Sequence, residues 1–300
     1  MLRDGDPQVV AFLYPGQGSQ RPGMGRAFLR CPWALAIVSE AAEILGYSPL
    51  EAWDDPERLG RTSYVQPLLL LVEWLSTEAM VREAGVSPDA VCGHSLGEYA
   101  ALAAAEVIDW DEALHLVALR GRLMEEAARE NPGSMAAIIA PQAEVERIAT
   151  EAGCYAVNYN APEQVVVSGE RGAVKRAVEL ARDRGFRAIP LKVSGPFHTP
   201  FMREAEEEMR RALEEIEFVP PTVTFISAVS GRPESDPERI RELMGRQMTS
   251  PVRWTEVIRS LEELGIKEAV EVGPGEVLVK LGRGIAPALV FKSWREYVGV

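Results

Sequence analysis

Short apolar runs alternate along the chain with longer segments in which apolar and polar residues recur at helical spacing. The run 9–14 is apolar, contains β-branched and aromatic residues and ends at Pro15-Gly16, which predicts a buried strand that enters a glycine loop. Asp109, with Glu112 three residues later, has the pattern of a capping box and predicts a helix start. The same reasoning predicts a strand over 89–92 and helices over 68–84, 96–105 and 109–130.

The rhythm changes after the break at Asn131-Pro132-Gly133. The next segment predicts strands over 134–140, 154–158, 164–168 and 186–193, and helices over 142–152 and 171–184. This β-α-β-β-α-β order is that of a ferredoxin-like unit. We therefore expect an inserted small subdomain at residues 131–195, with residues 1–130 and 196–300 forming one large α/β catalytic domain.

Helices and strands alternate again in the last third of the chain, with helices predicted over 202–216 and 254–264 and strands over 222–227 and 268–272. Such alternation indicates a mostly parallel sheet that is covered on both faces. The expected fold class is therefore α/β: an α/β-hydrolase-like parallel-sheet domain with an inserted ferredoxin-like α+β subdomain.

A G-x-S-x-G pattern, Gly93-His94-Ser95-Leu96-Gly97, lies between a predicted strand and a predicted helix. In this context the serine sits on a sharp turn with its hydroxyl above the sheet, and the flanking glycines let the neighbouring backbone pass. The N–H of Leu96 then points from the helix N-terminus toward a developing oxyanion. A glycine-bounded turn whose serine only caps the helix is the alternative, and the strand and helix around the motif disfavour it.

A serine nucleophile needs a base, and the chain has three histidines. His94 adjoins Ser95, but neighbours in a sharp turn diverge, which favours a packing role. His115 lies inside a predicted helix, where a structural role is the simpler interpretation. His198 lies in a loop between a predicted strand and a helix that Thr199-Pro200 would begin, and such loops commonly display catalytic groups. By elimination and position, His198 is the expected base.

Arg120 shares one stripe of its predicted helix with Ala113, Val117 and Met124. An arginine in an otherwise apolar stripe must find an anion, because burying an unpaired charge is costly. On the residues alone, an internal salt bridge with one of the many glutamates is the favoured partner. A carboxylate substrate is the second alternative, because the guanidinium fork matches a carboxylate in bidentate geometry.

The composition is that of a globular protein, with 47% hydrophobic and 26% charged residues in a chain of 300. A net charge of −13 argues against nucleic acid as a partner. No apolar stretch approaches the ~20 residues of a membrane span, and residues 1–7 lack the pattern of a signal peptide. We therefore expect a cytoplasmic protein without a membrane segment. Cys31, Cys92 and Cys154 form neither a metal pattern nor a disulfide framework and are interpreted as buried thiols.

Several motifs in order resemble those of the malonyl-CoA:acyl-carrier-protein transacylases, over about residues 9 to 290. The matching segments are 14–20 (YPGQGSQ), 93–101 (GHSLGEYAA), 119–124 (LRGRLM), 157–162 (VNYNAP), 164–169 (QVVVSG), 195–199 (GPFHT), Gln247 with 251–254 (PVRW), and 271–275 (EVGPG). One departure lies at 227–231 (SAVSG), where relatives commonly carry asparagines, and we assign no role there.

The resemblance implies roles only at matching positions. It makes Ser95 the acylated residue and His198 its activator, with Gln17 and the backbone of Leu96 binding the oxyanion. It also implies that a backbone carbonyl at Gln247 orients the histidine. The implied substrate-binding residues are Arg120, which would hold the malonyl carboxylate, Gln66, Met124, Phe197, Asn158 and Asn160. Phe197, beside His198, is the bulky neighbour associated with selection of malonyl over methylmalonyl groups.

The implied reaction is ping-pong transfer of malonyl from malonyl-CoA through Ser95 to the phosphopantetheine thiol of an acyl carrier protein, in fatty acid or polyketide biosynthesis, without metal or cofactor. The carrier would act in trans on a protein that we expect to be a monomer. Between 171 and 192, seven basic residues face only two acidic ones, which makes Arg171, Lys175 and Arg176 the candidate docking residues.

Three other functions share these motifs. A hydrolase would pass the acyl group to water, although a general thioesterase has no use for a buried cation such as Arg120. A noncatalytic acyl-binding subunit would not need the set Gln17, Ser95, Arg120 and His198. An acyltransferase of malonate decarboxylation or polyketide synthesis would differ only in its partner.

Overall fold

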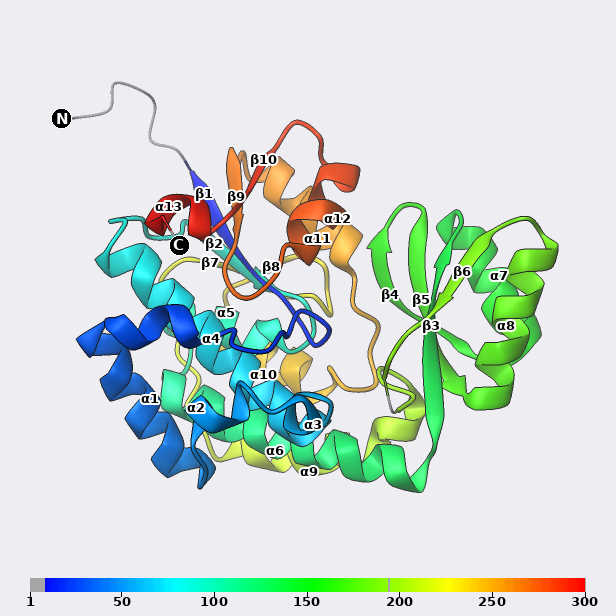
Figure 1. Ribbon diagram of the computed structural model, residues 1–300. Helices are drawn as coiled ribbons and strands as arrows, with labels where there is room; N and C mark the ends of the chain where they lie inside the picture. Colours follow the sequence, from blue (N-terminus) through cyan, green and yellow to red (C-terminus); the bar gives the residue numbers. More distant parts are fainter. Residues whose placement is uncertain (1–8, 194, 300) are drawn as a thin grey trace.

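The computed structural model describes residues 9–193 and 195–299 and contains two α/β units, a large one and a small one (Figure 1). The N-terminal stretch 1–7 and Ser194, which precedes the predicted histidine loop, lie outside the described residues. Within the described ranges, no helix combines the length and apolar character needed to cross a membrane.

The large unit is built on a six-stranded sheet in the order β10-β9-β1-β2-β7-β8. Its strands are β1 (Val10–Tyr14), β2 (Ala90–Gly93), β7 (Thr224–Ile226), β8 (Pro233–Glu234), β9 (Glu268–Glu271) and β10 (Val290–Ser293). All neighbouring pairs are parallel except β7–β8. The carboxyl ends of β1 and β2 therefore meet at one edge of the sheet, which is where open α/β sheets place their sites.

Helices cover both faces of this sheet. Alternate residues of β1 point to opposite faces, and all of them are apolar, so both faces must be shielded from water. Phe12 and Tyr14 pack into a core with α4 and α6, whereas Ala11 and Leu13 pack into a second core with α11 and α12. The helices of the large unit are α1 (Pro32–Leu45), α2 (Pro49–Ala52), α3 (Pro56–Leu59), α4 (Thr62–Arg82), α5 (Gly97–Ala104), α6 (Trp110–Glu130), α9 (Arg203–Glu214), α10 (Pro237–Gly245), α11 (Trp254–Glu263), α12 (Val277–Ile285) and α13 (Arg295–Val298). Two 3₁₀ helices, η1 (Arg26–Arg30) and η2 (Pro200–Met202), complete it.

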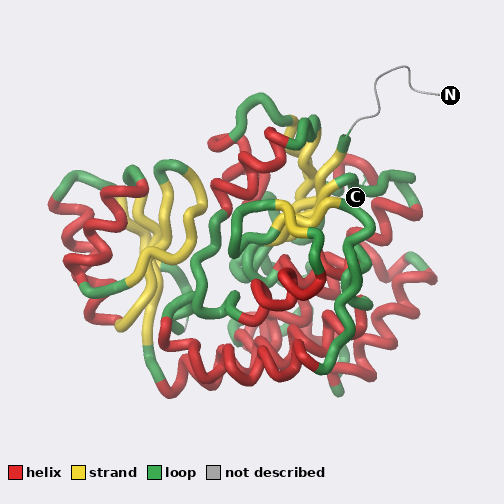
Figure 2. Tube along the Cα trace, turned by 180° about the vertical axis from the view of Figure 1, so that it is seen from behind, coloured by secondary structure: helices red, strands yellow, loops and turns green. Residues whose placement is uncertain are grey.

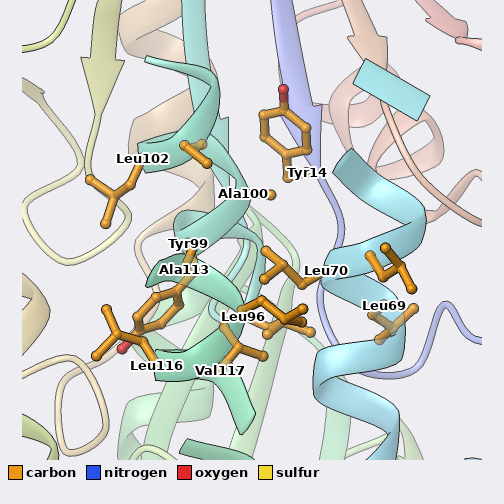
Figure 3. Packing of buried hydrophobic residues seen from close by; sticks show 14 of the residues in the cluster. Tyr14, Leu69, Leu70, Leu96, Tyr99, Ala100, Leu102, Ala113, Leu116 and Val117 are labelled. Carbon is orange, nitrogen blue, oxygen red and sulfur yellow. The ribbon is translucent and has the colours of Figure 1, made fainter. Parts of the chain in front are cut away.

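The short helix α5 lies at the centre of the larger core. It packs against α4, α6 and β1, and Figure 3 shows Tyr99 of α5 beside Leu116 of α6 and Leu96 beside Leu70 of α4. All four of these side chains are buried. Packing against α4, α6 and β1 therefore fixes the position of α5 and of its first residue, Gly97.

The small unit consists of a four-stranded antiparallel sheet and two helices. Its elements are β3 (Gly133–Ile139), α7 (Gln142–Ala152), β4 (Tyr155–Ala161), β5 (Gln164–Glu170), α8 (Arg171–Asp183) and β6 (Arg187–Pro190). The sheet order β4-β5-β3-β6 is that of a ferredoxin-like unit. In Figures 1 and 2, α7 and α8 lie on the face of this sheet that is turned away from the large unit.

The predicted fold class is confirmed: a parallel-sheet α/β unit carries a separate antiparallel subdomain. Three predicted boundaries are wrong by three residues or more, and one of them is the end of the strand expected over 154–158, which extends to Ala161. The helix expected over 68–84 begins at Thr62 and contains Pro67, and the strand expected over 186–193 ends at Pro190. The capping box is present, since Glu112 accepts a hydrogen bond from the Asp109 N–H at the start of α6.

Candidate active site

The G-x-S-x-G segment forms the turn between β2 and α5, and Ser95 has a positive φ of 55° there. A non-glycine residue adopts this conformation only when its surroundings enforce it. Close approach explains the glycines: a Cβ on Gly97 would lie 2.2 Å from the carbonyl oxygen of Tyr14, and one on Gly93 would lie 1.9 Å from the backbone of Gly97. The backbone is thus packed too tightly for a side chain at Gly93 or Gly97.

Ser95 and His198 lie together, as the sequence predicts. The Ser95 Oγ is 2.8 Å from His198 Nε2. On the other side of the ring, His198 Nδ1 is 3.2 Å from the carbonyl oxygen of Gln247 and 3.0 Å from that of Ser250. Two carbonyl acceptors fix the tautomer in which Nδ1 carries the proton, so that Nε2 is free to accept the proton of Ser95.

The backbone around His198 holds the ring in place. His198 has a φ of 60°, and Thr199 caps the short helix η2 by accepting a hydrogen bond from the Phe201 N–H. Burial, which is the largest cause, together with the positive charge of Arg120 and the nearby His94 lowers the pKa of His198 to about 3. The imidazole is therefore neutral at physiological pH, which is the form that a general base requires.

Arg120 is 1% exposed and lies on the face of α6 that is turned to Ser95. Its N–H groups donate to neutral acceptors only: Gln66 Oε1 from Nη1 at 2.8 Å, Ser95 Oγ from Nη2 at 3.0 Å, and Gln247 Oε1 from Nε at 3.2 Å and from Nη2 at 3.0 Å. Among the described residues, no carboxylate lies within ion-pair distance of it. The glutamate salt bridge that the residues alone favour is therefore not formed, and the charge faces Ser95.

A small cavity of about 80 Å³ lies over the nucleophile. Both units form its walls: the lining residues are Gln17, Gln66, His94, Ser95, Leu96, Arg120, Met124, Asn158, Phe197 and His198, with Met135, Leu191 and Val193 from the small unit and the segment that follows it. A serine paired with a neutral imidazole, beside a buried guanidinium, can form a covalent ester with an acyl group that carries an anion.

Most of the predicted substrate residues line this cavity. Gln66 Nε2 is 3.3 Å from Met124 Sδ, and Gln17 Nε2 donates to Thr62 Oγ1 at 3.3 Å. Asn158 presents a buried Oδ1 that has no hydrogen-bond partner among the described residues. Asn160 is not part of the lining, because its Oδ1 is bonded to His94 Nε2 at 2.8 Å.

Among the described residues, neither of the other two histidines forms a hydrogen bond with Ser95. His94 packs on Trp254 at 5.5 Å between ring centroids, in addition to its bond to Asn160, and burial lowers its pKa. His115 is exposed on α6, outside the cavity lining. The described residues contain no group of three or more His, Cys, Asp or Glu side chains that could hold a metal ion.

Sequence reasoning missed two kinds of site residue. Ser250 offers a second carbonyl to His198, and Met135, Leu191 and Val193 supply the wall from the small unit. Backbone acceptors and apolar walls carry no signal of their own in a single sequence. A signal did exist for Glu98, a charged residue within an apolar helix directly after the nucleophile.

Comparison with known proteins agrees with this geometry. Residues 11–285 match the family model described as acyl transferase domain. The malonyl CoA-acyl carrier protein transacylase of Escherichia coli strain K12 is 37% identical over 295 residues, which are 95% of this chain and 96% of the relative. That of Bacillus subtilis strain 168 is 40% identical over 279 residues, or 90% and 88% of the two chains.

Solved structures are similar over the same length. The malonyl CoA-acyl carrier protein transacylase of Coxiella burnetii superposes with a TM-score of 0.93 at 35% identity, covering 97% of this chain and 96% of the other. A malonyl-transacylase solved in complex with its type II PKS acyl-carrier protein has a TM-score of 0.91 at 37% identity, with 95% of each chain covered. The chain therefore belongs to the acyl transferase domain family and, within it, to the malonyl CoA-acyl carrier protein transacylases, which are acyltransferases.

Proposed function

We propose that this enzyme transfers the malonyl group of malonyl-CoA to the phosphopantetheine thiol of an acyl carrier protein, through a malonyl ester of Ser95. The observation that carries the proposal is the buried Arg120 guanidinium, which donates to Ser95 Oγ at 3.0 Å. A cation in this place favours an acyl group with a free carboxylate at its far end. The names of the relatives support the same acyl donor and carrier.

In the first half-reaction, the Oγ–H proton of Ser95 passes to His198 Nε2 while Oγ bonds to the thioester carbon. The oxyanion of the tetrahedral intermediate is bound by the backbone N–H of Leu96, at the N-terminus of α5, and by the side chain of Gln17. The carbon–sulfur bond then breaks, and the departing thiolate of CoA takes the proton from His198. Ser95 is left as the malonyl ester.

The second half-reaction runs in reverse order with a new thiol. His198 takes the proton of the phosphopantetheine thiol, and the thiolate attacks the ester carbon. When the carbon–oxygen bond breaks, Ser95 Oγ recovers the proton from His198. Arg120 holds the malonyl carboxylate through both steps, with Gln66 and Gln247 keeping its guanidinium in plane, while Met124, Phe197 and Asn158 bound the acyl group.

Intact-protein mass spectrometry tests this proposal. The wild-type protein, mixed with malonyl-CoA, should gain one malonyl group, and Ser95→Ala should gain none because the nucleophile is absent. Added holo-carrier protein should remove the adduct from the enzyme and acquire it. An adduct that disappears into free malonate at the same rate with and without the carrier would identify a hydrolase instead.

We also propose that the carrier docks beside α8, at Arg171, Lys175 and Arg176. Arg171 lines a surface hollow of about 340 Å³ together with Pro196 and Phe201, which flank the His198 loop. The contacts of two arginines refine the charge predicted for this surface. Arg184 is ion-paired with Glu144 and Glu151, which reduces the local excess of positive charge, and Arg176 donates to the carbonyl oxygen of Ala152.

The subdomain boundaries at 131 and 195, the monomeric state and the cytoplasmic location remain predictions from the sequence. The order of elements in the small unit supports the boundaries, since β3 begins at Gly133 and β6 ends at Pro190. Fatty acid and polyketide biosynthesis both use this chemistry, and one relative is named as a polyketide biosynthesis protein.

A further inference from the structure

Glu98 is a fully buried carboxylate that the mechanism above does not use. It lies in the first turn of α5, three residues after Ser95, and is 0% exposed. Its Oε1 accepts hydrogen bonds from Ser227 Oγ at 3.0 Å and from the Ala228 N–H at 2.8 Å, and its Oε2 accepts one from Gln247 Nε2 at 2.7 Å. Neutral donors therefore satisfy both oxygens, and no cation among the described residues forms an ion pair with it.

These contacts decide which way the amide of Gln247 points. Gln247 Nε2 donates to Glu98 Oε2 and also to the carbonyl oxygen of Ser95, at 2.8 Å. Gln247 Oε1 consequently faces Arg120, from which it accepts two hydrogen bonds. A carboxylate is only an acceptor and a guanidinium only a donor, so a flipped amide would create two repulsive pairings. Only one orientation of Gln247 fits between Glu98 and Arg120.

We propose that Glu98 is a positioning residue that sets the malonyl specificity of the site by fixing the orientation of Gln247. Its negative charge lies one amide group away from Arg120 and does not touch it. A direct ion pair would occupy the guanidinium and exclude a substrate carboxylate, whereas the amide relay orients Arg120 and leaves its charge available. This inference rests on the proposed function of Ser95 and Arg120.

The departure at residues 227–231 fits the same arrangement. Ser227 follows β7, which is hydrogen-bonded to the nucleophile strand β2. Its hydroxyl holds Glu98 Oε1 and also accepts a hydrogen bond from the Val229 N–H. The hydroxyl is therefore one of two donors to Glu98 Oε1, and the Ala228 N–H still holds this oxygen when the hydroxyl is removed.

The decisive variant is Glu98→Gln, compared with Ser227→Ala as its matched control. A glutamine keeps the size but adds an NH₂ group, which would face Gln247 Nε2 and force that amide to flip. Ser227→Ala removes a contact of Glu98 but leaves the bond to Gln247 in place. The measurement is the rate of Ser95 acylation by malonyl-CoA and by acetyl-CoA, read by intact-protein mass spectrometry as a ratio.

Glu98→Gln should lower the malonyl-to-acetyl ratio on the order of tenfold or more, which is the scale of one lost hydrogen bond to a charged group. Ser227→Ala should leave the ratio unchanged. If Glu98→Gln does not fold, Glu98→Asp replaces it, because its shorter carboxylate withdraws from Gln247 and should also lower the ratio. Equal losses for both acyl groups, in proportion to the loss of thermal stability, would show that Glu98 is only structural and would overturn the inference.

A pH series supplies a second readout. Burial raises the pKa of Glu98 to about 7, and its protonated form, like a glutamine, carries a donor. The charged and titratable groups around it are Arg120, Tyr99 and Cys92, and burial raises the pKa of Tyr99 to about 12 and that of Cys92 above its ordinary value. The ratio should therefore rise between about pH 6 and pH 8.5 in the wild type and stay level in Glu98→Gln.

Taking a ratio cancels the titration of His198, which both acyl groups need. A ratio that rises equally in Glu98→Gln would assign the titration to another group and overturn the inference. Failure of the proposed function gives a different result: the wild-type protein would form no malonyl adduct at any pH, or would lose the adduct to water at the same rate with and without the carrier protein.

Discussion

Arg120 lies fully buried and donates to Gln66, Gln247 and Ser95, all of them neutral acceptors. A buried cation that lacks a direct counterion gains most from a ligand that brings one, because the site has already excluded water. At the scale of single residues, this side chain is therefore expected to separate malonyl from acetyl groups.

Arg120→Ala should lower kcat/KM for malonyl-CoA on the order of a hundredfold or more, because a bidentate, charged contact is lost. Transfer from acetyl-CoA should fall much less, since an acetyl group has no carboxylate for Arg120 to hold. Steady-state kinetics with the two thioesters measure the difference. Arg122→Ala is the matched control, because Arg122 lies on the same helix but is exposed. Equal losses with both substrates would make Arg120 a structural residue.

The residues with reactive chemistry could be predicted from the sequence, and their supports could not. Ser95 and His198 are identified by the turn motif and by a loop at the start of a helix. Ser250 contributes only its backbone carbonyl, which every residue type possesses. Glu98 stands out as a charged residue in an apolar helix, but its partners Ala228 and Gln247 are distant in sequence and could not be predicted.

At the scale of elements, the packing of α5 against β1 depends on Gly97. Gly97→Ala would place a methyl group 2.2 Å from the Tyr14 carbonyl oxygen, which belongs to the backbone and cannot rotate away. We expect a loss of about 3 kcal/mol in the free energy of unfolding, at the upper end of overpacking costs. Ser95 acylation should fall as well, because the nucleophile turn shifts with α5.

Chemical denaturation of Gly97→Ala beside Gly284→Ala checks this prediction. Gly284 lies in α12 with no atom within 4 Å of an added Cβ. Its replacement should stabilise the protein by up to about 1 kcal/mol, the helix-propensity difference between glycine and alanine. Similar unfolding curves for the two variants would mean that the β1–α5 contact is not tight.

The ends of most helices and strands lie close to those predicted from the local sequence. Two of the exceptions lie at proline residues. Pro67 lies in the sixth position of α4, and the predicted helix begins directly after it. The residue before a proline disfavours helical geometry. Packing of the apolar residues 65–72 against α6 outweighs that local preference. In β6 the reverse holds, because Pro190 has no N–H to donate and the strand ends there.

At the scale of the whole molecule, Glu73 links stability to pH. This residue of α4 is 0% exposed, and neither of its carboxylate oxygens has a hydrogen-bond partner among the described residues. Burial, and secondly the charge of Glu271, raise the pKa of Glu73 well above its ordinary value of 4.5. A raised pKa means that this group's stabilisation is complete below about pH 4.5 and is lost as the pH rises toward the folded-state value.

Glu73→Gln should remove this dependence, because a glutamine cannot lose a proton. Between about pH 5 and pH 8, the melting temperature of the wild type should therefore fall relative to that of the variant. Glu40→Gln, on the exposed face of α1, removes the same charge without burial and serves as the control. Parallel melting curves for the wild type and Glu73→Gln across this range would contradict the assignment.

The docking of the carrier is also a property of the whole surface. Arg171→Glu combined with Lys175→Glu should raise the KM for the carrier protein several-fold at low salt, because charge steering acts mainly on association. The pair avoids Arg176, whose bond to Ala152 supports the end of α7. The effect should shrink at physiological ionic strength, where the screening length is about 8 Å.

Lys267→Glu with Lys280→Glu is the matched control for this experiment. Both lysines are exposed on the large unit, so the change in net charge is the same. Titration of both double variants with holo-carrier protein compares the two surfaces. An equal rise in KM would show that net charge, not α8, determines the encounter.

The walls of the acyl cavity come from both units: the reacting groups lie on the large unit, and Met135, Leu191 and Val193 close the space from the other side. The catalytic residues and part of the wall that limits acyl bulk are therefore encoded in different stretches of the gene, although Met124 and Phe197 of the large unit also bound the acyl group. Recombination that exchanges the ferredoxin-like segment between relatives can then alter which acyl groups fit while the chemistry is inherited intact. For protein engineering, exchange of this segment is a way to change the acyl group that the enzyme delivers to the carrier protein.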